Sequence, residues 1–351
     1  MRLRSARALA LAMIAIATAT AGGCVSPDVV GTAEAPARPE QAPAIGAGPA
    51  PSAGTLAREA KDPSPGPHTE PGSKGSPGET NRDADEAAEV YGGLGTWIDI
   101  YDDEAWRHPV QIVRSMVDHG VRTAYLQTSN YSRNAPFVHP EGVAAFLDAA
   151  RRNDLRVVAW YLPGFRDVEL DLHRTLRAIM FRTDNGSRFD SFALDIESPE
   201  VRNPWVRTRR LLALSERIRR EVGTEYPLGA IVASPHRLKV ADPRFWPSFP
   251  WRRLAGTYDV FLPMTYYTYR VHGPRLASWY TAQSVQIIRQ ETSGMQVPIH
   301  VVGGLSFDAT GGETRGFVQT VRRRGVLGAS YYTFPGVTRE QWEALRPLAE
   351  R

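Results

Sequence analysis

Cysteine is almost missing from this 351-residue sequence, in which Cys24 is the only one. A monomer with one cysteine forms no disulfide, so its folded part must depend on an apolar core, for which 42% hydrophobic residues suffice. The apolar run at residues 8–21 is too short to span a bilayer. No G-x-G-x-x-G motif or P-loop follows a β-rich segment, which removes the usual reason to expect a nucleotide-binding sheet.

The N-terminal segment has the form of a secretory signal, because Arg2, Arg4 and Arg7 precede the apolar run. The tetrapeptide Ala21-Gly22-Gly23-Cys24 resembles the lipobox of bacterial lipoproteins, although that family usually has Leu at the position of Ala21. The resemblance implies that residues 1–23 are removed and that the lipidated Cys24 attaches the protein to the extracytoplasmic side of a cell membrane. The alternative is ordinary cleavage after Ala21, which would leave a lone thiol.

A strong charge of either sign is absent from the mature chain. Removing residues 1–23 takes away three arginines and no acid, so the net charge falls from +4 to +1. Bulk charge therefore does not support a nucleic-acid partner, and we expect none.

The segment at residues 24–88 has almost no large apolar side chains and is rich in Pro, Gly, Ala and Glu. Residues 25–88 hold eleven of the 27 prolines. Such a segment cannot bury enough apolar surface to offset its ordering entropy, so the sequence predicts a disordered tether. It would hold a folded domain, predicted at residues 93–351, away from the membrane.

That domain alternates short β-branched or aromatic runs with longer amphipathic stretches. Eight strand–helix units in about 250 residues predict an α/β fold of the (β/α)8 TIM-barrel class. The strands are expected at residues 95–101, 123–127, 156–162, 189–198, 228–233, 259–266, 299–302 and 329–333. The helices are expected at 110–119, 141–153, 170–182, 207–222, 251–255, 278–292, 314–324 and 339–345.

The carboxyl ends of barrel strands carry the active site in this fold. Here those ends are acidic and aromatic, as carbohydrate binding requires, while lysines are absent and histidines sparse, which argues against Schiff-base or His-rich metal chemistry. We expect substrate-binding residues among Asp99, Tyr101, Tyr125, Gln127, Tyr161, Tyr267 and Tyr331. Further polar or aromatic residues at these ends are Asp102, Ser234, His236, Tyr266, Tyr269, Asp308 and Tyr332.

The fourth strand, FDSFALDIES at residues 189–198, places two acids at its end. Alternation puts Asp195 and Glu197 on the same face as the small Ala193, opposite an apolar face. Their Cα atoms are about 6.6 Å apart, two strand residues, and two like charges in a partly dry cleft raise one pKa. Glu197 is our candidate for the protonated acid and Asp195 for its ionised partner.

These residues resemble the catalytic motif of the chitinase-like glycoside hydrolases of family 18, D-x-x-D-x-D-x-E. Asp190, Asp195 and Glu197 match its first, third and last positions, and Met264-Thr265-Tyr266 matches the start of the family's M-x-Y-D. The resemblance implies that Glu197 protonates the glycosidic oxygen. Asp195 and Tyr266 would hold the substrate's acetamido group, which attacks the anomeric carbon in place of an enzyme nucleophile.

The sequence departs from that pattern at Ala193 and Tyr267, where family 18 has aspartates. A D-x-E at the fourth strand, and a first strand like Trp97-Ile98-Asp99, also occur in family 25 lysozymes. Both families act on N-acetylated cell-wall or chitin-like glycans, so the resemblance implies such a polysaccharide or peptidoglycan as substrate and no cofactor.

Two other functions remain open from the residues alone. One is a glycan-binding barrel without catalysis. The other is a metal-dependent TIM-barrel hydrolase, in which the acidic run Asp99, Asp102, Asp103 and Glu104 would bind a divalent cation. Our interpretation is a monomeric, lipid-anchored glycosidase with catalytic residues Glu197, Asp195 and Tyr266, and without a bound metal.

Overall fold

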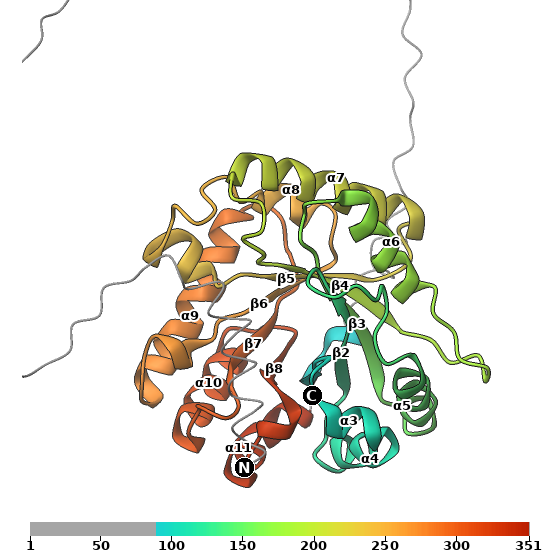
Figure 1. The fold of residues 1–351 in the computed structure, drawn as a ribbon. Coiled ribbons are helices and arrows are strands. Elements are labelled where there is room, and N and C mark those ends of the chain that lie inside the picture. The colour runs from blue at the N-terminus through green and yellow to red at the C-terminus, as the bar shows by residue number, and fades with distance from the viewer. Residues whose placement is uncertain (1–88, 351) are drawn as a thin grey trace, which may run out of the picture. The chain divides into compact units, whose positions relative to one another are not determined.

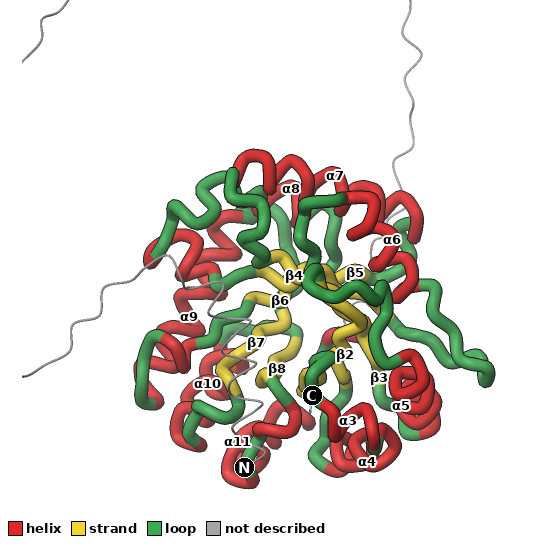
Figure 2. Tube along the Cα trace, viewed as in Figure 1, coloured by secondary structure: helices red, strands yellow, loops and turns green. Residues whose placement is uncertain are grey.

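The computed structural model of the chain describes residues 89–350. The predicted signal, the lipidation site at Cys24 and the whole predicted tether therefore lie outside the described residues. Within the described part, strands and helices alternate around a central barrel, as the sequence predicted (Figure 1). Figure 2 shows the strands enclosed by a ring of helices.

Eight parallel strands form the barrel, in the spatial order β6-β5-β4-β3-β2-β1-β8-β7. Isolated parallel bridges from Phe261 to Ile299 and from Met264 to Val302 link β6 to β7 and bring the two edges of the sheet together. The TIM-barrel prediction is confirmed. The strands are β1 (Gly93–Ile98), β2 (Thr123–Asn130), β3 (Arg156–Leu162), β4 (Ser191–Ile196), β5 (Leu228–Val232), β6 (Val260–Pro263), β7 (His300–Leu305) and β8 (Gly328–Tyr332).

The helices cover the outside of the barrel, and several begin at residues that suit a helix N-terminus. Asn203 caps α7 through two backbone N–H groups, while Thr310 and Thr338 each form a capping box. The α-helices are α3 (Asp103–Arg107), α4 (Pro109–Asp118), α5 (Pro140–Arg152), α6 (Val168–Ile179), α7 (Pro204–Val222), α8 (Trp251–Ala255), α9 (Pro274–Glu291), α10 (Gly311–Arg323) and α11 (Arg339–Ala349).

Strand alternation divides the core into two layers. On β4, Phe192, Leu194 and Ile196 belong to the larger apolar cluster between barrel and helices, as predicted. Ala193 belongs to the smaller cluster inside the barrel, where it packs with aromatic and aliphatic side chains such as Trp97. The register of β4 therefore points Asp195 into the barrel.

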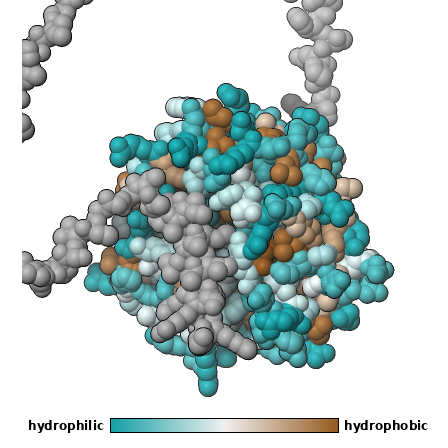
Figure 3. Space-filling model, in the orientation of Figure 1, coloured by the Kyte–Doolittle hydropathy of each residue, from teal (hydrophilic) through white to brown (hydrophobic). Residues whose placement is uncertain are grey.

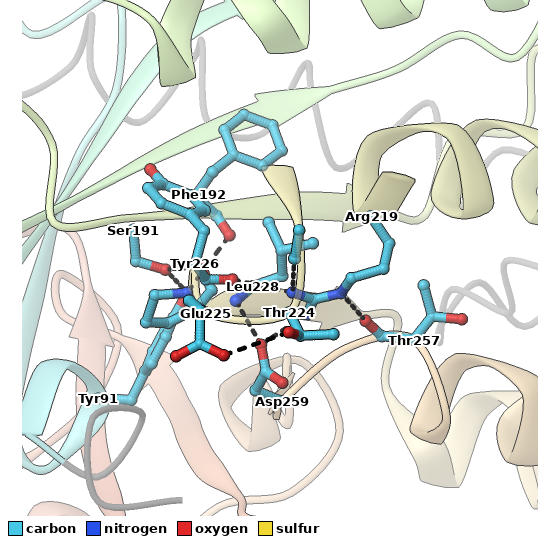
Figure 4. Close-up of polar contacts among 12 residues, drawn as sticks. Tyr91, Ser191, Phe192, Arg219, Thr224, Glu225, Tyr226, Leu228, Thr257 and Asp259 are labelled. Carbon is cyan, nitrogen blue, oxygen red and sulfur yellow. Dashed lines mark hydrogen bonds and ion pairs between the residues drawn. The ribbon is translucent and has the colours of Figure 1, made fainter. Parts of the chain in front are cut away.

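The amino-terminal end of the barrel is filled by side chains. The Tyr91 hydroxyl lies 2.6 Å from Ser191 Oγ, and a Cβ on Gly229 would lie only 2.7 Å from that hydroxyl, so glycine is needed there (Figure 4). Asp259 accepts from the Leu228 amide and pairs with Arg219 at 2.7 Å, which joins β5, β6 and α7 (Figure 4). A substrate would therefore enter at the carboxyl ends of the strands.

The surface of the described residues is mainly hydrophilic, with scattered apolar patches (Figure 3). Within residues 89–350 no helix is long and apolar enough to cross a membrane. The exposed large apolar side chains are Leu170, Met180, Trp205, Val240, Leu276 and Trp279.

Candidate active site

Two carboxylates occupy the carboxyl end of β4. Asp195, the last inward residue of the strand, is only 5% exposed, and its Oδ1 has no hydrogen-bond partner among the described residues. Glu197 follows directly after β4 and is partly buried. An unpaired buried carboxylate oxygen is costly unless it serves a purpose, so this is the place to look for chemistry.

Two further side chains beside Asp195 carry polar atoms without partners among the described residues. We call Asp195, Gln127 and Trp160 the floor of the site. Gln127 on β2 and Trp160 on β3 are register neighbours, both buried. Gln127 accepts a bond from the Ile100 amide at 3.2 Å, but its Nε2 has no partner within residues 89–350. Trp160 Nε1 also has none. The floor therefore offers two N–H donors and one carboxylate acceptor.

Asp99 brings a third carboxylate from the end of β1. Its Oδ2 accepts from the Tyr332 hydroxyl and its Oδ1 from the Tyr101 amide, both at 2.8 Å. Burial raises the pKa of Asp99, although these two hydrogen bonds oppose the shift. Tyr332 is an inward residue of β8 that our list of substrate-binding residues did not contain.

Tyr266 lies near enough to Glu197, Asp195 and Asp99 for their charges to act on it. Its φ of 31° and ψ of 52° place a non-glycine residue in the left-handed region, where the chain turns from β6 into the short helical turn Tyr267–Tyr269. The ring is 6.2 Å from those of Tyr269 and Tyr332. Burial raises the pKa of Tyr266 well above its ordinary value, helped by the charges of Glu197 and Asp195. The phenol therefore stays protonated and can donate.

The pKa values of both β4 carboxyls are raised. Burial raises the pKa of Asp195 well above its ordinary value, and the negative charge of Glu197 raises it further. Burial raises the pKa of Glu197 to about 7, although the positive charge of Arg237 opposes this. Burial is the largest cause of both shifts, because desolvation disfavours the charged form of each carboxyl. The assignment of Glu197 as the protonated acid and Asp195 as its ionised partner stays a prediction.

Three aromatic residues predicted to bind substrate lie on the outer side of the barrel. Tyr161 donates to Asp171 at 2.6 Å under α6, and Tyr267 and Tyr331 hydrogen-bond each other beneath Phe317 of α10. All three are essentially unexposed. These residues were predicted because they lie near the ends of the strands, without regard to the face of the sheet on which each ring lies. Alternation points Trp160 and Tyr332 inward instead of Tyr161 and Tyr331.

Tyr125 points inward but lies too deep to form the floor. It stacks on Trp97 with ring centroids 4.2 Å apart and contacts His300, and it is completely buried. Tyr101 lies in the loop after β1, where its hydroxyl accepts from Asn130 and the guanidinium of Arg133 lies 4.6 Å from its ring centroid. Of the predicted substrate-binding residues, Asp99, Gln127 and Tyr101 thus lie around the carboxyl end of the barrel.

The acidic residues after β1 lie at the N-terminus of a helix and stabilise it. Asp102 caps α3 through the Ala105 amide, while Asp103 and Glu104 lie in the first turn of that helix, which favours acids. Burial raises the pKa of Asp102 to about 7, and the charge of Asp99 adds to the shift. Within residues 89–350 no group of three His, Cys, Asp or Glu side chains is arranged to hold a metal ion.

Known protein families and curated proteins contain no match to this sequence. Its fold matches solved glycoside hydrolases. The endo-β-1,4-mannanase from Thermotoga petrophila is 10% identical, with a TM-score of 0.58, over 76% of this chain and 77% of that one. The Bacillus cereus spore cortex-lytic enzyme SleL is 9% identical, with a TM-score of 0.54, over 73% and 74%.

A family 18 chitinase from Cycas revoluta is 12% identical, with a TM-score of 0.51, and the match covers 73% of this chain and 98% of that one. At these identities the likeness shows the fold alone. The chain therefore has a TIM barrel of the kind found in glycoside hydrolases, with paired carboxylates at the carboxyl end of β4.

Proposed function

We propose that this protein is a cell-envelope lipoprotein whose barrel hydrolyses glycosidic bonds in N-acetylated cell-wall or extracellular polysaccharide. The observation that carries the proposal is the pair of carboxyls Asp195 and Glu197 at the end of β4, whose pKa values are both raised by burial. A carboxyl with a pKa of about 7 is still partly protonated at neutral pH and can act as a general acid.

In the proposed reaction Glu197 protonates the glycosidic oxygen as the bond to the leaving sugar breaks. Asp195, beneath it, accepts a hydrogen bond from the substrate's acetamido N–H and so directs the carbonyl oxygen of that group at the anomeric carbon. The neutral phenol of Tyr266 donates to the same group. Trp160 and Tyr332 supply flat apolar surfaces against which a sugar ring packs.

The substrate class rests on the resemblance to family 18 and on the fold, which is shared with a chitinase and a cortex-lytic enzyme. The proposed lipid on Cys24 and the tether would bring the barrel to glycan outside the cytoplasmic membrane. We expect a monomer, with the polysaccharide and the membrane as its partners.

A non-catalytic glycan-binding barrel is the second candidate, and one observation favours it. Ala193 stands where family 18 has the middle aspartate, inside an apolar layer with Trp97 and Tyr125. The carboxylate that would exchange a proton with Asp195 from below is thus replaced by a methyl group.

Reducing-end release separates the two candidates. The purified chain and its Glu197→Gln variant are incubated with N-acetylated oligosaccharides and with purified peptidoglycan. A glycosidase releases reducing ends, and the variant loses at least about 100-fold of the rate, the usual contribution of a general acid. Binding of both proteins without release by either would instead support the glycan-binding barrel.

A further inference from the structure

A group of basic and polar side chains follows β5 on one side of the barrel opening. We define the β5 basic cluster as Arg237, Arg270 and His236. Arg237 begins the helical turn Arg237–Ala241, and Arg270 follows the turn after Tyr266. The His236 ring lies 5.7 Å from that of Trp279 and 4.8 Å from that of Tyr280, both on α9. Segments after β5 and β6 and the start of α9 thus meet here.

The positive charge of this cluster is poorly compensated. Arg237 has one ion pair, to Asp242 at 3.6 Å, and Arg270, which is exposed, has none with the described residues. Burial lowers the pKa of both His236 and Arg237, and the positive charge of Arg270 lowers both further. A buried third arginine, Arg207, contacts the same Phe245 ring as Arg237 and donates to the carbonyls of Ser198 and Phe245.

Uncharged polar groups lie beside the β5 basic cluster, and we call the cluster and these groups together the wall. The hydroxyls of Ser234 and Tyr280 lie 3.0 Å apart, and the Arg237 amide points at Ser234 Oγ at 3.4 Å. His236 Nδ1 is buried and has no hydrogen-bond partner in the described part of the chain. The wall therefore combines two guanidinium groups, two hydroxyls and one ring nitrogen without a partner among the described residues, a set of polar groups suited to a carboxylate.

This wall faces the catalytic pair. β5 is the register neighbour of β4, with Ile231 opposite Asp195 and Val232 opposite Ile196. The Ala233 amide bonds the Ile196 carbonyl, so the segment that carries His236 and Arg237 leaves the barrel beside the segment that carries Glu197. Arg237 is close enough to act on the charge of Glu197. A glycan positioned over Glu197 would extend past this wall.

We propose that the β5 basic cluster is a subsite for a negatively charged sugar substituent, so that the barrel prefers carboxylate-bearing glycan to neutral glycan. The proposal rests on the proposed function for the site in which the glycan lies. Within N-acetylated cell-wall glycans, peptidoglycan strands that have lost their peptides carry such a carboxylate on every second sugar, whereas chitin oligosaccharides lack it. Arg270 is the residue to test, because it is exposed and is not part of the proposed catalytic group.

The test measures binding by calorimetry, with Glu197→Gln introduced into the full-length chain so that substrate is not consumed. The probes are peptide-free peptidoglycan strands and chitin oligosaccharides of equal length. We expect about tenfold tighter binding of the charged strands, as one charge-assisted hydrogen bond provides. Arg270→Ala should remove most of this preference and Arg270→Glu all of it, with binding of chitin oligosaccharides unchanged. Arg220→Ala, at the far end of α7, removes the same charge as a control.

Equal binding of the two glycans, or an equal loss of preference in the Arg220 and Arg270 variants, would overturn the subsite. Absence of binding to either glycan would overturn it as well. Hydrolysis is scored separately with Glu197 intact. If the preference for charged glycan depends on Arg270 but no reducing ends are released, the subsite is supported and the glycosidase is rejected. Cleavage of both glycans without preference would keep the glycosidase and reject the subsite.

Discussion

Glu197 and Asp195 are held in surroundings that disfavour their charges. Burial raises the pKa of both side chains, and for Asp195 the neighbouring charge of Glu197 adds to the shift. A carboxyl whose pKa is higher in the folded than in the unfolded chain binds more protons when folded. Stability that is present at acidic pH is therefore lost as the pH rises through the folded pKa.

Replacing Glu197 by Gln should flatten this pH dependence. The pKa of Glu197 moves from an unfolded value near 4.5 to about 7, so its ionisation costs on the order of 3 kcal/mol between pH 4 and pH 8. We expect the variant to gain stability over the wild type by about that amount at pH 8 and by much less at pH 4. Urea unfolding at the two pH values measures the difference. Parallel curves for the two proteins would contradict the raised pKa.

At the scale of single residues, the acids of the site could be predicted from the sequence, but not every residue that surrounds them. Polar side chains at the ends of barrel strands are unusual, and the alternation of side chains between the two faces is reliable on a short strand. These two features allowed the prediction of Asp195, Glu197, Tyr266 and Asp99. The raised pKa of Glu197 could not be derived in this way, since it depends on burial and on the opposing charge of Arg237, which lies forty residues further along the chain.

At the scale of elements, β3 shows why the aromatic residues were harder to place. Its end carries two adjacent rings, of which Trp160 faces the barrel interior and Tyr161 faces α6. The strand itself was predicted with its observed bounds, yet the choice between the rings depends on which face is inward. The same ambiguity led to Tyr331 instead of Tyr332 on β8.

Paired substitutions on β3 test this assignment. Tyr161→Phe removes the hydrogen bond to the buried Asp171 and should cost about 1–3 kcal/mol of stability, while glycan turnover stays near that of the wild type. Trp160→Phe should cut turnover about tenfold or more, because it removes the Nε1 donor and part of the floor. Thermal unfolding and reducing-end release are measured for both proteins. A larger loss of turnover for Tyr161→Phe would reverse the assignment.

The segment after β4 is held by an arginine on the following helix. Arg207 of α7 is 2% exposed and donates to the carbonyl of Ser198, the residue after Glu197, at 3.2 Å. It also donates to the Phe245 carbonyl and stacks on Trp246 at 4.0 Å. One side chain therefore links the proposed acid to the loop after β5, which makes Arg207 a positioning residue.

Arg207→Met should preserve the aliphatic packing and lose these bonds. We expect a loss of about 2–4 kcal/mol of stability from the carbonyls left without donors, and about a tenfold fall in kcat with a smaller change in KM. Arg210→Met, on the same helix, is the control, because Arg210 donates to the carbonyls of Phe165 and Arg166 and not to Ser198. Equal effects on kcat in the two variants would show that the role of Arg207 is only structural.

At the scale of the whole molecule, the sequence predicted the barrel well. Every predicted strand and helix has a counterpart, because strand and helix periods differ clearly in this chain. Most differences are shifts of a few residues at the ends. The short helix α3 and the turns Arg237–Ala241 and Tyr267–Tyr269 were missed, since their form depends on tertiary packing against the barrel. The N-terminal predictions remain predictions, because Cys24 lies outside the described residues.

Exchange of the proposed lipidation site tests the anchor. The Cys24→Ser variant lacks the thiol that would carry the lipid, so it should move from the membrane fraction to the soluble extracytoplasmic fraction. Ser26→Ala, two residues further on, should stay with the wild type. Cell fractionation followed by immunoblotting measures both. Membrane attachment of Cys24→Ser would mean that something other than lipid on this cysteine holds the protein there.

The central claim is that Glu197 donates a proton to the leaving group of a glycoside. The most direct measurement compares hydrolysis of two N-acetylglucosaminides by the wild type and Glu197→Gln. One substrate has a leaving group that requires protonation, as in an oligosaccharide, and the other a highly acidic phenol that departs as an anion. The account predicts a rate loss of at least about 100-fold for Glu197→Gln on the first substrate and little loss on the second. An equal loss on both substrates would contradict general-acid catalysis by Glu197.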